Sequence, residues 1–202
     1  MCDLENCDPN DLSRPSVSPT DRRLFLAGAL ALPLATILAN VDLAEAQAAK
    51  GVSINQTTAD GRTVSAYFAE ADKKDTPVVI LIHEWWGLND NIKTMAEDIR
   101  AKGFHAIAID LFNGSVATNR DEAKTQTKAV KASEANATIA AWVDWAKANG
   151  NGKVATLGWC FGGGWSLSAA LNTKLDAAVI YYGRVTANAD SLQKLNAPLL
   201  GH

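Results

Sequence analysis

The sequence is poor in cysteine and has no excess of basic charge. It contains three cysteines, and two of them, Cys2 and Cys7, lie within the first 46 residues. Three cysteines cannot build the disulfide framework on which many small secreted domains depend. After residue 46 the chain carries 16 basic and 15 acidic side chains, and so balanced a charge excludes the basic surface of a nucleic-acid-binding domain. We expect no nucleic-acid partner.

Internal repeats, low-complexity stretches and Pro/Gly/Ser-rich linkers are also missing from the sequence. The composition, 48% hydrophobic and 20% charged, is that of a globular protein. A chain of this size buries roughly 68 to 70% of its unfolded surface, enough for a core without disulfides. One folded domain is therefore expected, at residues 47–202.

Residues 1–46 have the features of an export signal. An Arg-Arg-Leu-Phe-Leu sequence that begins at Arg22 opens an apolar run ending at Ala39, and Ala44-Glu45-Ala46 supplies the small residues that a signal peptidase requires. The arginine pair resembles the twin-arginine type of signal. Because the run is shorter than the roughly 20 residues needed to span a bilayer, we expect no membrane anchor. The sequence predicts a periplasmic or secreted protein.

The remaining residues alternate between strand and helix patterns. Continuous apolar, β-branched runs predict strands covered on both faces at 78–82, 105–109, 154–157, 177–181 and 198–200. Strands at 52–57 and 63–69 flank an Asp-Gly turn and are expected to form an antiparallel edge. Helical periodicity predicts helices at 92–102, 121–148, 163–171 and 191–195. The alternation predicts an α/β fold with a doubly wound, mostly parallel sheet.

The six residues from Gly158, Gly-Trp-Cys-Phe-Gly-Gly, match the nucleophile-elbow pattern with cysteine in the place of serine. They lie between a predicted strand and a predicted helix, as that pattern requires. A helix N-terminus beside Cys160 favours the thiolate, and the backbone N–H of Phe161 is placed to stabilise an oxyanion. The alternative interpretation is a glycine-rich turn around a small buried cysteine. No Lys-Ser or Lys-Thr follows, which argues against a phosphate loop.

A second group of polar and aromatic residues, His83-Glu84-Trp85-Trp86-Gly87, follows the predicted strand at 78–82. In an open α/β sheet, the carboxyl ends of the strands face the ligand crevice. His83-Glu84 begins like a zinc-protease motif, but Gly87 stands where that motif needs its second histidine. We therefore predict an active site with neither metal nor cofactor, although Glu84 and the tryptophans could instead cap the core.

Four ordered motifs together resemble the dienelactone hydrolase family of the α/β-hydrolase superfold. They are Glu84-Trp85-Trp86-Gly87, Asp110-Leu111-Phe112, the six residues from Gly158, and Tyr181-Tyr182-Gly183. The resemblance extends from about residue 51 to residue 202.

The resemblance implies a role for each of four residues. Cys160 is the implied nucleophile, and Glu84 contacts its thiol and helps to activate it when substrate enters. The backbone N–H groups of Trp85 and Phe161 form the implied oxyanion hole.

Three aromatic residues, Trp86, Trp159 and Tyr182, are assigned to the substrate pocket. The family member that hydrolyses dienelactone has a substrate-binding arginine after its Asp-Leu-Tyr segment, but Asn113-Gly114-Ser115 follows here. Arg120 is interpreted as a solvated charge at the start of a helix.

The superfold orders its triad as nucleophile, acid and histidine, and after Cys160 the sequence offers Asp176, Asp190 and His202. Asp176 precedes its strand and therefore falls at the wrong end of the sheet, whereas His202 falls in the next strand. We expect the chain to stop before the triad Asp and His of the family, leaving the C-terminal part of the fold incomplete.

The predicted function is hydrolysis of a small ester or lactone through an acyl-thioester on Cys160. The alternative is a non-catalytic binding protein or an inactive remnant, because a thiol without a base does not turn over. A thiol redox protein is disfavoured, since no resolving cysteine accompanies Cys160.

Overall fold

The computed structural model describes residues 50–185 and 189–202, so the predicted export signal lies outside the described residues. Strands of the described part form one seven-stranded sheet in the order β1-β2-β4-β3-β5-β6-β7. Their bounds are β1 Val52–Thr57, β2 Thr63–Ala69, β3 Val78–Ile82, β4 His105–Ile109, β5 Val154–Trp159, β6 Ala177–Tyr181 and β7 Leu199–Gly201. β1 pairs with β2 and β2 with β4 in antiparallel fashion, while the other pairs are parallel. The predicted antiparallel edge and parallel sheet are confirmed.

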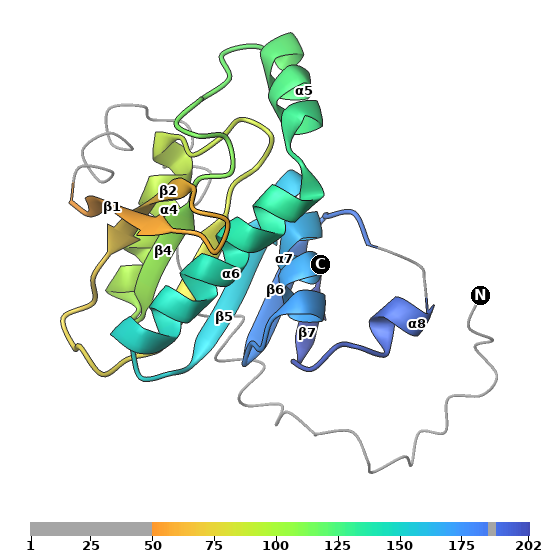
Figure 1. The fold of residues 1–202 in the computed structure, drawn as a ribbon. Helices are drawn as coiled ribbons and strands as arrows, with labels where there is room; N and C mark the ends of the chain where they lie inside the picture. The colour runs from red at the N-terminus through yellow and green to blue at the C-terminus, as the bar shows by residue number, and fades with distance from the viewer. Residues whose placement is uncertain (1–49, 186–188) are drawn as a thin grey trace. The chain divides into compact units, whose positions relative to one another are not determined.

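Helices cover both faces of this sheet (Figure 1). They are α4 Asp90–Ala101, α5 Arg120–Ala129, α6 Ala132–Asn149, α7 Phe161–Asn172 and α8 Ala189–Leu192. Because neighbouring strand residues point to opposite faces, Ile80 and Ile82 join the core beneath α6 and α7, and Leu81 joins the core beneath α4. The doubly wound arrangement brings the carboxyl ends of β3, β5 and β6 together at one edge.

The structure corrects the predicted helix at 121–148, which is two helices. Val130 and Lys131 have extended backbone between α5 and α6. Val130 packs against the core there, so a tertiary contact interrupts a sequence that has neither proline nor glycine at this point. Helix α7 starts at Phe161, two residues before the predicted start.

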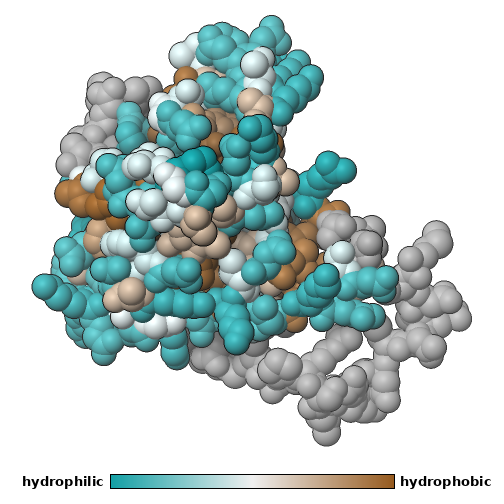
Figure 2. Space-filling view, in the orientation of Figure 1, coloured by the Kyte–Doolittle hydropathy of each residue, from teal (hydrophilic) through white to brown (hydrophobic). Residues whose placement is uncertain are grey.

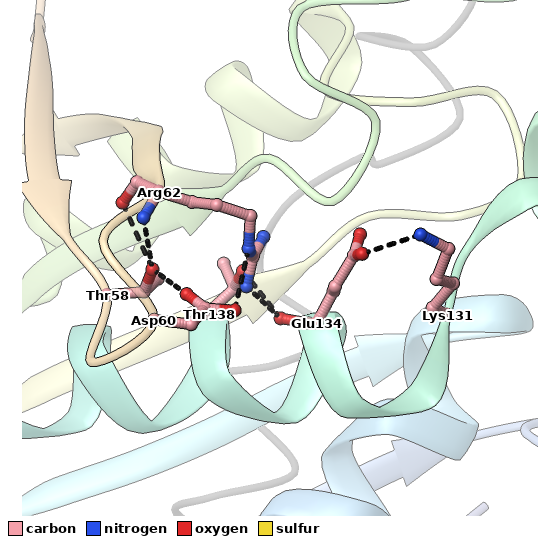
Figure 3. A network of polar contacts seen from close by, with 6 residues as sticks. All are labelled: Thr58, Asp60, Arg62, Lys131, Glu134 and Thr138. Carbon is pink, nitrogen blue, oxygen red and sulfur yellow. Dashed lines mark hydrogen bonds and ion pairs between the residues drawn. The ribbon is translucent and has the colours of Figure 1, made fainter.

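A polar network joins the turn between β1 and β2 to α6 (Figure 3). Arg62 bridges the two elements, donating to Asp60 at 2.9 Å and to the carbonyl oxygen of Glu134 at 2.9 Å. Lys131 at the start of α6 pairs with the Glu134 carboxylate at 2.9 Å. The antiparallel edge of the sheet is thereby held to the helix that covers it.

Much of the surface seen in Figure 2 is hydrophilic, with apolar side chains gathered beside α7 and toward β7. Exposed Leu199 and Leu200 belong to β7 at the edge of the sheet. Among the described helices, none combines the length and the apolar character that crossing a membrane requires.

Candidate active site

Cys160 occupies a sharp turn between β5 and α7. Its backbone has φ 52° and ψ −114°, a left-handed conformation that costs a non-glycine residue on the order of 1 to 3 kcal/mol. The Cys160 N–H donates to the carbonyl oxygen of Tyr181 at 3.0 Å, and its own carbonyl accepts the N–H of Gly163 at 3.1 Å. The strained turn is therefore fixed from both sides.

Glycine is required on both sides of this turn because backbone segments approach it closely. A Cβ atom at Gly158 would overlap the backbone of Gly162. At Gly162 a Cβ would overlap the backbone carbonyls of Ile82 and His83 at the end of β3. The first turn of α7 can therefore pack directly against the carboxyl end of the neighbouring strand, which brings Cys160 next to the segment after β3.

The position of Cys160 at the N-terminus of α7 also sets its electrostatic surroundings. Twelve residues make up α7, and none in its first turn is acidic. The partial positive charge of the helix N-terminus therefore favours negative charge that develops on a carbonyl oxygen bound beside the half-buried thiol.

Glu84 and Tyr182 meet next to this turn, from the ends of β3 and β6. The Tyr182 hydroxyl donates to Glu84 Oε1 at 2.7 Å, and Tyr182 itself has a positive φ of 39°. Partial burial of the hydroxyl raises the pKa of Tyr182, and the Glu84 carboxylate and the Cys160 thiol raise it further. The hydroxyl therefore stays protonated and remains a donor.

The family resemblance implies that Glu84 contacts the Cys160 thiol. Within the described residues, Glu84 makes no hydrogen bond to that thiol, and its carboxylate accepts the hydroxyl of Tyr182 instead. The sequence does not predict this pair, because 98 residues separate the two side chains. The positions of both residues at the carboxyl ends of parallel strands were the available signal.

Two backbone N–H groups beside Cys160 have no acceptor among the described residues, namely those of Trp85 and Phe161. Backbone donors inside a protein are almost always paired. The two residues that carry these donors line the same cavity as Cys160, and unpaired N–H groups near a nucleophile are what an oxyanion hole requires.

A cavity of about 850 Å³ opens at this turn. Aromatic and aliphatic side chains make up most of its lining, which consists of Trp85, Thr127, Cys160, Phe161, Gly164, Trp165, Leu167, Ser168, Leu171, Tyr182, Arg184 and Val185. Four of the residues predicted for the site line this cavity: the expected nucleophile Cys160, the expected oxyanion donors Trp85 and Phe161, and the expected pocket residue Tyr182.

Trp86 and Trp159, which the sequence predicts as pocket residues, are not among the described residues that line this cavity. Trp159 ends β5 on the face opposite to Cys160, where it packs beneath α4 and stacks on Tyr181 at a centroid distance of 6.1 Å. The Trp86 ring lies edge-on to Trp85 at 5.1 Å. Alternation along the strand accounts for Trp159, because consecutive side chains point to opposite faces.

None of the residues considered as triad partners is among the described residues that line the cavity. The Asp176 carboxylate accepts the N–H of Val154 at 2.8 Å. This contact lies where β5 and β6 begin, at the end of the sheet opposite to Cys160. His202 follows β7, where its N–H donates to Ile180 at 2.9 Å and its ring contacts Tyr181 at 5.6 Å. Asp190 is exposed on α8.

Two further site predictions concern charge and metal. Arg120 is the exposed first residue of α5, consistent with a solvated charge. No group of three or more His, Cys, Asp or Glu residues within the described ranges is arranged to hold a metal ion.

Comparison with known proteins gives a consistent family match. The sequence profile described as "Dienelactone hydrolase family" matches residues 64–202. A protein of Saccharolobus solfataricus named as a candidate carboxymethylenebutenolidase is 23% identical over 181 residues, covering 70% of each chain. A Salmonella typhi protein with the same name is 29% identical over 189 residues, covering 84% of this chain and 70% of its own.

Solved structures show the same fold. A crystal structure from Klebsiella pneumoniae, titled as a candidate dienelactone hydrolase, superposes with a TM-score of 0.65 at 23% identity. The match covers 75% of this chain and 71% of that one.

Proposed function

Because the chain belongs to the dienelactone hydrolase family, a family of α/β-fold hydrolases, we propose that it cleaves small ester or lactone substrates through Cys160. The observation that carries the proposal is the positive φ of Cys160 in a cavity that Trp85 and Phe161, whose N–H groups have no acceptor among the described residues, also line. A strained, half-buried thiol with oxyanion donors beside it suits attack on a carbonyl.

The reaction starts when the Cys160 sulfur attacks the carbonyl carbon. The carbonyl electron pair moves to oxygen, where the N–H groups of Trp85 and Phe161 stabilise the negative charge. Collapse of this intermediate breaks the bond between the carbonyl carbon and the alcohol oxygen and leaves a thioester on Cys160. The alcohol leaves with the proton that the Cys160 thiol gives up. Water then attacks the thioester, releasing the carboxylic acid and restoring the thiol.

The cavity lining indicates the class of substrate. Phe161, Trp165 and Leu171 provide apolar walls, and Arg184 is the only charged side chain among the described lining residues. We propose that the acyl or alcohol group is apolar, since an apolar wall favours burial of apolar surface by roughly 25 cal/mol per Å².

Rapid mixing with p-nitrophenyl acetate tests the nucleophile. The full chain is expected to release a burst of p-nitrophenol equal to the protein concentration and to carry one acetyl group on Cys160 by mass spectrometry. Cys160→Ala should abolish both. Ser168→Ala is the matched control, because Ser168 is another nucleophilic side chain of the cavity and should be dispensable. A burst that persists in Cys160→Ala, or no acylation of the wild type, contradicts the proposal.

A non-catalytic binding protein is the second candidate. It is favoured by one observation: no residue lining the cavity in the described part is a His, Asp or Glu. Loss of general acid–base assistance slows a reaction by about 100- to 10,000-fold. Slow turnover after a full burst identifies an acylating enzyme with impaired hydrolysis, whereas saturable binding of the ester without acylation identifies a binding protein.

We also propose that residues 1–46 direct export to the periplasm or beyond. The arginine pair at Arg22 and Arg23, the apolar run and the Ala44-Glu45-Ala46 sequence support this proposal.

A further inference from the structure

His83 is a buried histidine whose contacts are not needed for the steps above. Its side chain is fully buried at the end of β3. The ring lies between two aromatic rings, with centroid distances of 4.7 Å to Phe112 and 5.8 Å to Phe161. It thus packs directly against the residue that follows Cys160.

The two ring nitrogens of His83 have different partners, and these partners determine the tautomer. The backbone N–H of Leu111 donates to His83 Nε2 at 3.1 Å. A backbone N–H can only donate, so Nε2 carries no proton. The ring proton is therefore on Nδ1, which donates to the carbonyl oxygen of Glu84 at 2.6 Å.

The Glu84 carbonyl and the Trp85 N–H belong to one peptide unit. That unit is planar, and no described peptide bond is cis. Fixing the direction of the Glu84 C=O therefore fixes the direction of the Trp85 N–H, which points the opposite way. The Gly87 N–H also reaches this carbonyl, but at 3.3 Å, so His83 makes the shorter of the two bonds.

We propose that His83 is a positioning residue that orients the Trp85 N–H of the oxyanion hole by holding the Glu84–Trp85 peptide plane. This inference rests on the proposed ester hydrolysis. A hydrogen bond to the carbonyl also polarises the peptide and strengthens its N–H as a donor. His83 touches no reacting atom and acts only through the peptide unit that follows it.

The charged and titratable groups around His83 fit a neutral ring. Asp110, after β4, has its Oδ1 4.0 Å from His83 Nε2, beyond hydrogen-bonding range. That oxygen accepts the N–H of Phe112 at 2.7 Å. The Glu84 carboxylate accepts the hydrogen bond of Tyr182, and Cys160 is the residue before Phe161, whose ring stacks on His83. Burial lowers the pKa of His83, in keeping with the neutral form.

Two variants separate positioning from simple space filling. His83→Gln keeps a donor and an acceptor on one planar group, whereas His83→Leu fills the space with neither. We expect His83→Leu to slow the acylation rate of Cys160 by p-nitrophenyl acetate at least about tenfold, given that loss of an oxyanion donor costs about 100- to 1,000-fold. The substrate concentration at half-saturation should be unchanged, and His83→Gln should restore most of the rate.

NMR of the full chain gives a readout that does not depend on activity. In the wild type, the His83 ring should be protonated at Nδ1 alone at neutral pH, and the Leu111 amide should be protected from hydrogen exchange. His83→Leu should lose the Leu111 protection, and His83→Gln should keep it. If His83→Leu does not fold, the wild-type tautomer and the His83→Gln rate decide the question.

The outcomes for His83 and for the proposed reaction can be told apart. The inference is overturned by either of two NMR results in the wild type: a His83 ring protonated at Nε2, or a Leu111 amide that is not protected from exchange. It is also overturned if His83→Gln acylates slowly, or if a folded His83→Leu variant acylates at the wild-type rate. A wild type that is never acylated contradicts the proposed function and with it the role of His83 in that reaction, whatever NMR shows for the tautomer.

Discussion

His83 contributes to stability as well as to geometry, because its ring is buried in the neutral form. Burial lowers the pKa of His83 in the folded state below the ordinary value near 6.5. As the pH falls through that value, the unfolded chain takes up a proton that the folded chain resists. The free energy of unfolding should therefore fall with pH on the acid side.

The corresponding prediction compares the wild type with His83→Gln. Between about pH 7.5 and about pH 5.5, the wild type should lose up to about 1 kcal/mol more stability than the variant, because the variant has no ring to protonate. Urea titrations at both pH values measure this difference. His105, which is also buried, is common to both proteins and cancels. If the free energy of unfolding changes with pH by the same amount in the two proteins, then His83 takes up its proton equally well in the folded and the unfolded state, and the prediction is wrong.

Some residues of the site can be predicted from the sequence and others cannot. Cys160 could be predicted because its turn is encoded within six consecutive residues. The Glu84–Tyr182 hydrogen bond could not, because it depends on how the ends of β3 and β6 meet. The direction in which the Trp159 side chain points could not be predicted, because the predicted strand stops at residue 157, whereas β5 continues to Trp159.

At the scale of elements, local pattern and tertiary contact contributed unequally. The apolar runs predicted all five strands, and three of them, β3, β4 and β6, have the predicted bounds, since a strand buried on both faces has a continuous hydrophobic sequence. β5 extends two residues beyond its predicted end, and β7 is shifted by one residue. The break between α5 and α6 was missed because its cause is the packing of Val130. The start of α7 was placed late because Gly162 and Gly163 have low helix propensity, although close packing against β3 requires glycine at 162.

The first turn of α7 offers a matched test of that packing. Gly162→Ala should destabilise the fold by about 1 to 3 kcal/mol, because the added Cβ overlaps the backbone at the end of β3. Gly164→Ala adds the same atom two positions later, where its nearest neighbour is 3.5 Å away. Alanine lowers the backbone entropy of the unfolded chain relative to glycine. The Gly164→Ala variant should therefore be as stable as the wild type or more stable by roughly 0.5 to 1 kcal/mol.

Chemical denaturation of both glycine variants measures the two effects on one scale. Circular dichroism of the folded baselines checks that α7 is retained. Equal stability changes at the two positions would mean that helix propensity alone, and not contact with β3, governs this turn.

At the scale of the whole molecule, the folded domain and the N-terminal segment have separate sequence signatures. Twelve of the described residues line a mainly apolar cavity at one edge of the sheet, and all of them come after residue 46. The segment before residue 47 contributes three of the 19 basic residues, two of them adjacent at Arg22 and Arg23. Its proposed role is therefore testable without altering the fold or the site.

Replacing both Arg22 and Arg23 by lysine tests whether the pair is read as an arginine motif. Lysine preserves the positive charge but lacks the planar, multi-donor guanidinium. A twin-arginine receptor should therefore retain the variant in the cytoplasm, whereas a signal that needs only positive charge should export it. Arg14→Lys is the matched control, since Arg14 lies outside the pair. Cell fractionation with immunoblotting gives the ratio of exported to retained protein, and normal export of the double variant would refute the twin-arginine assignment.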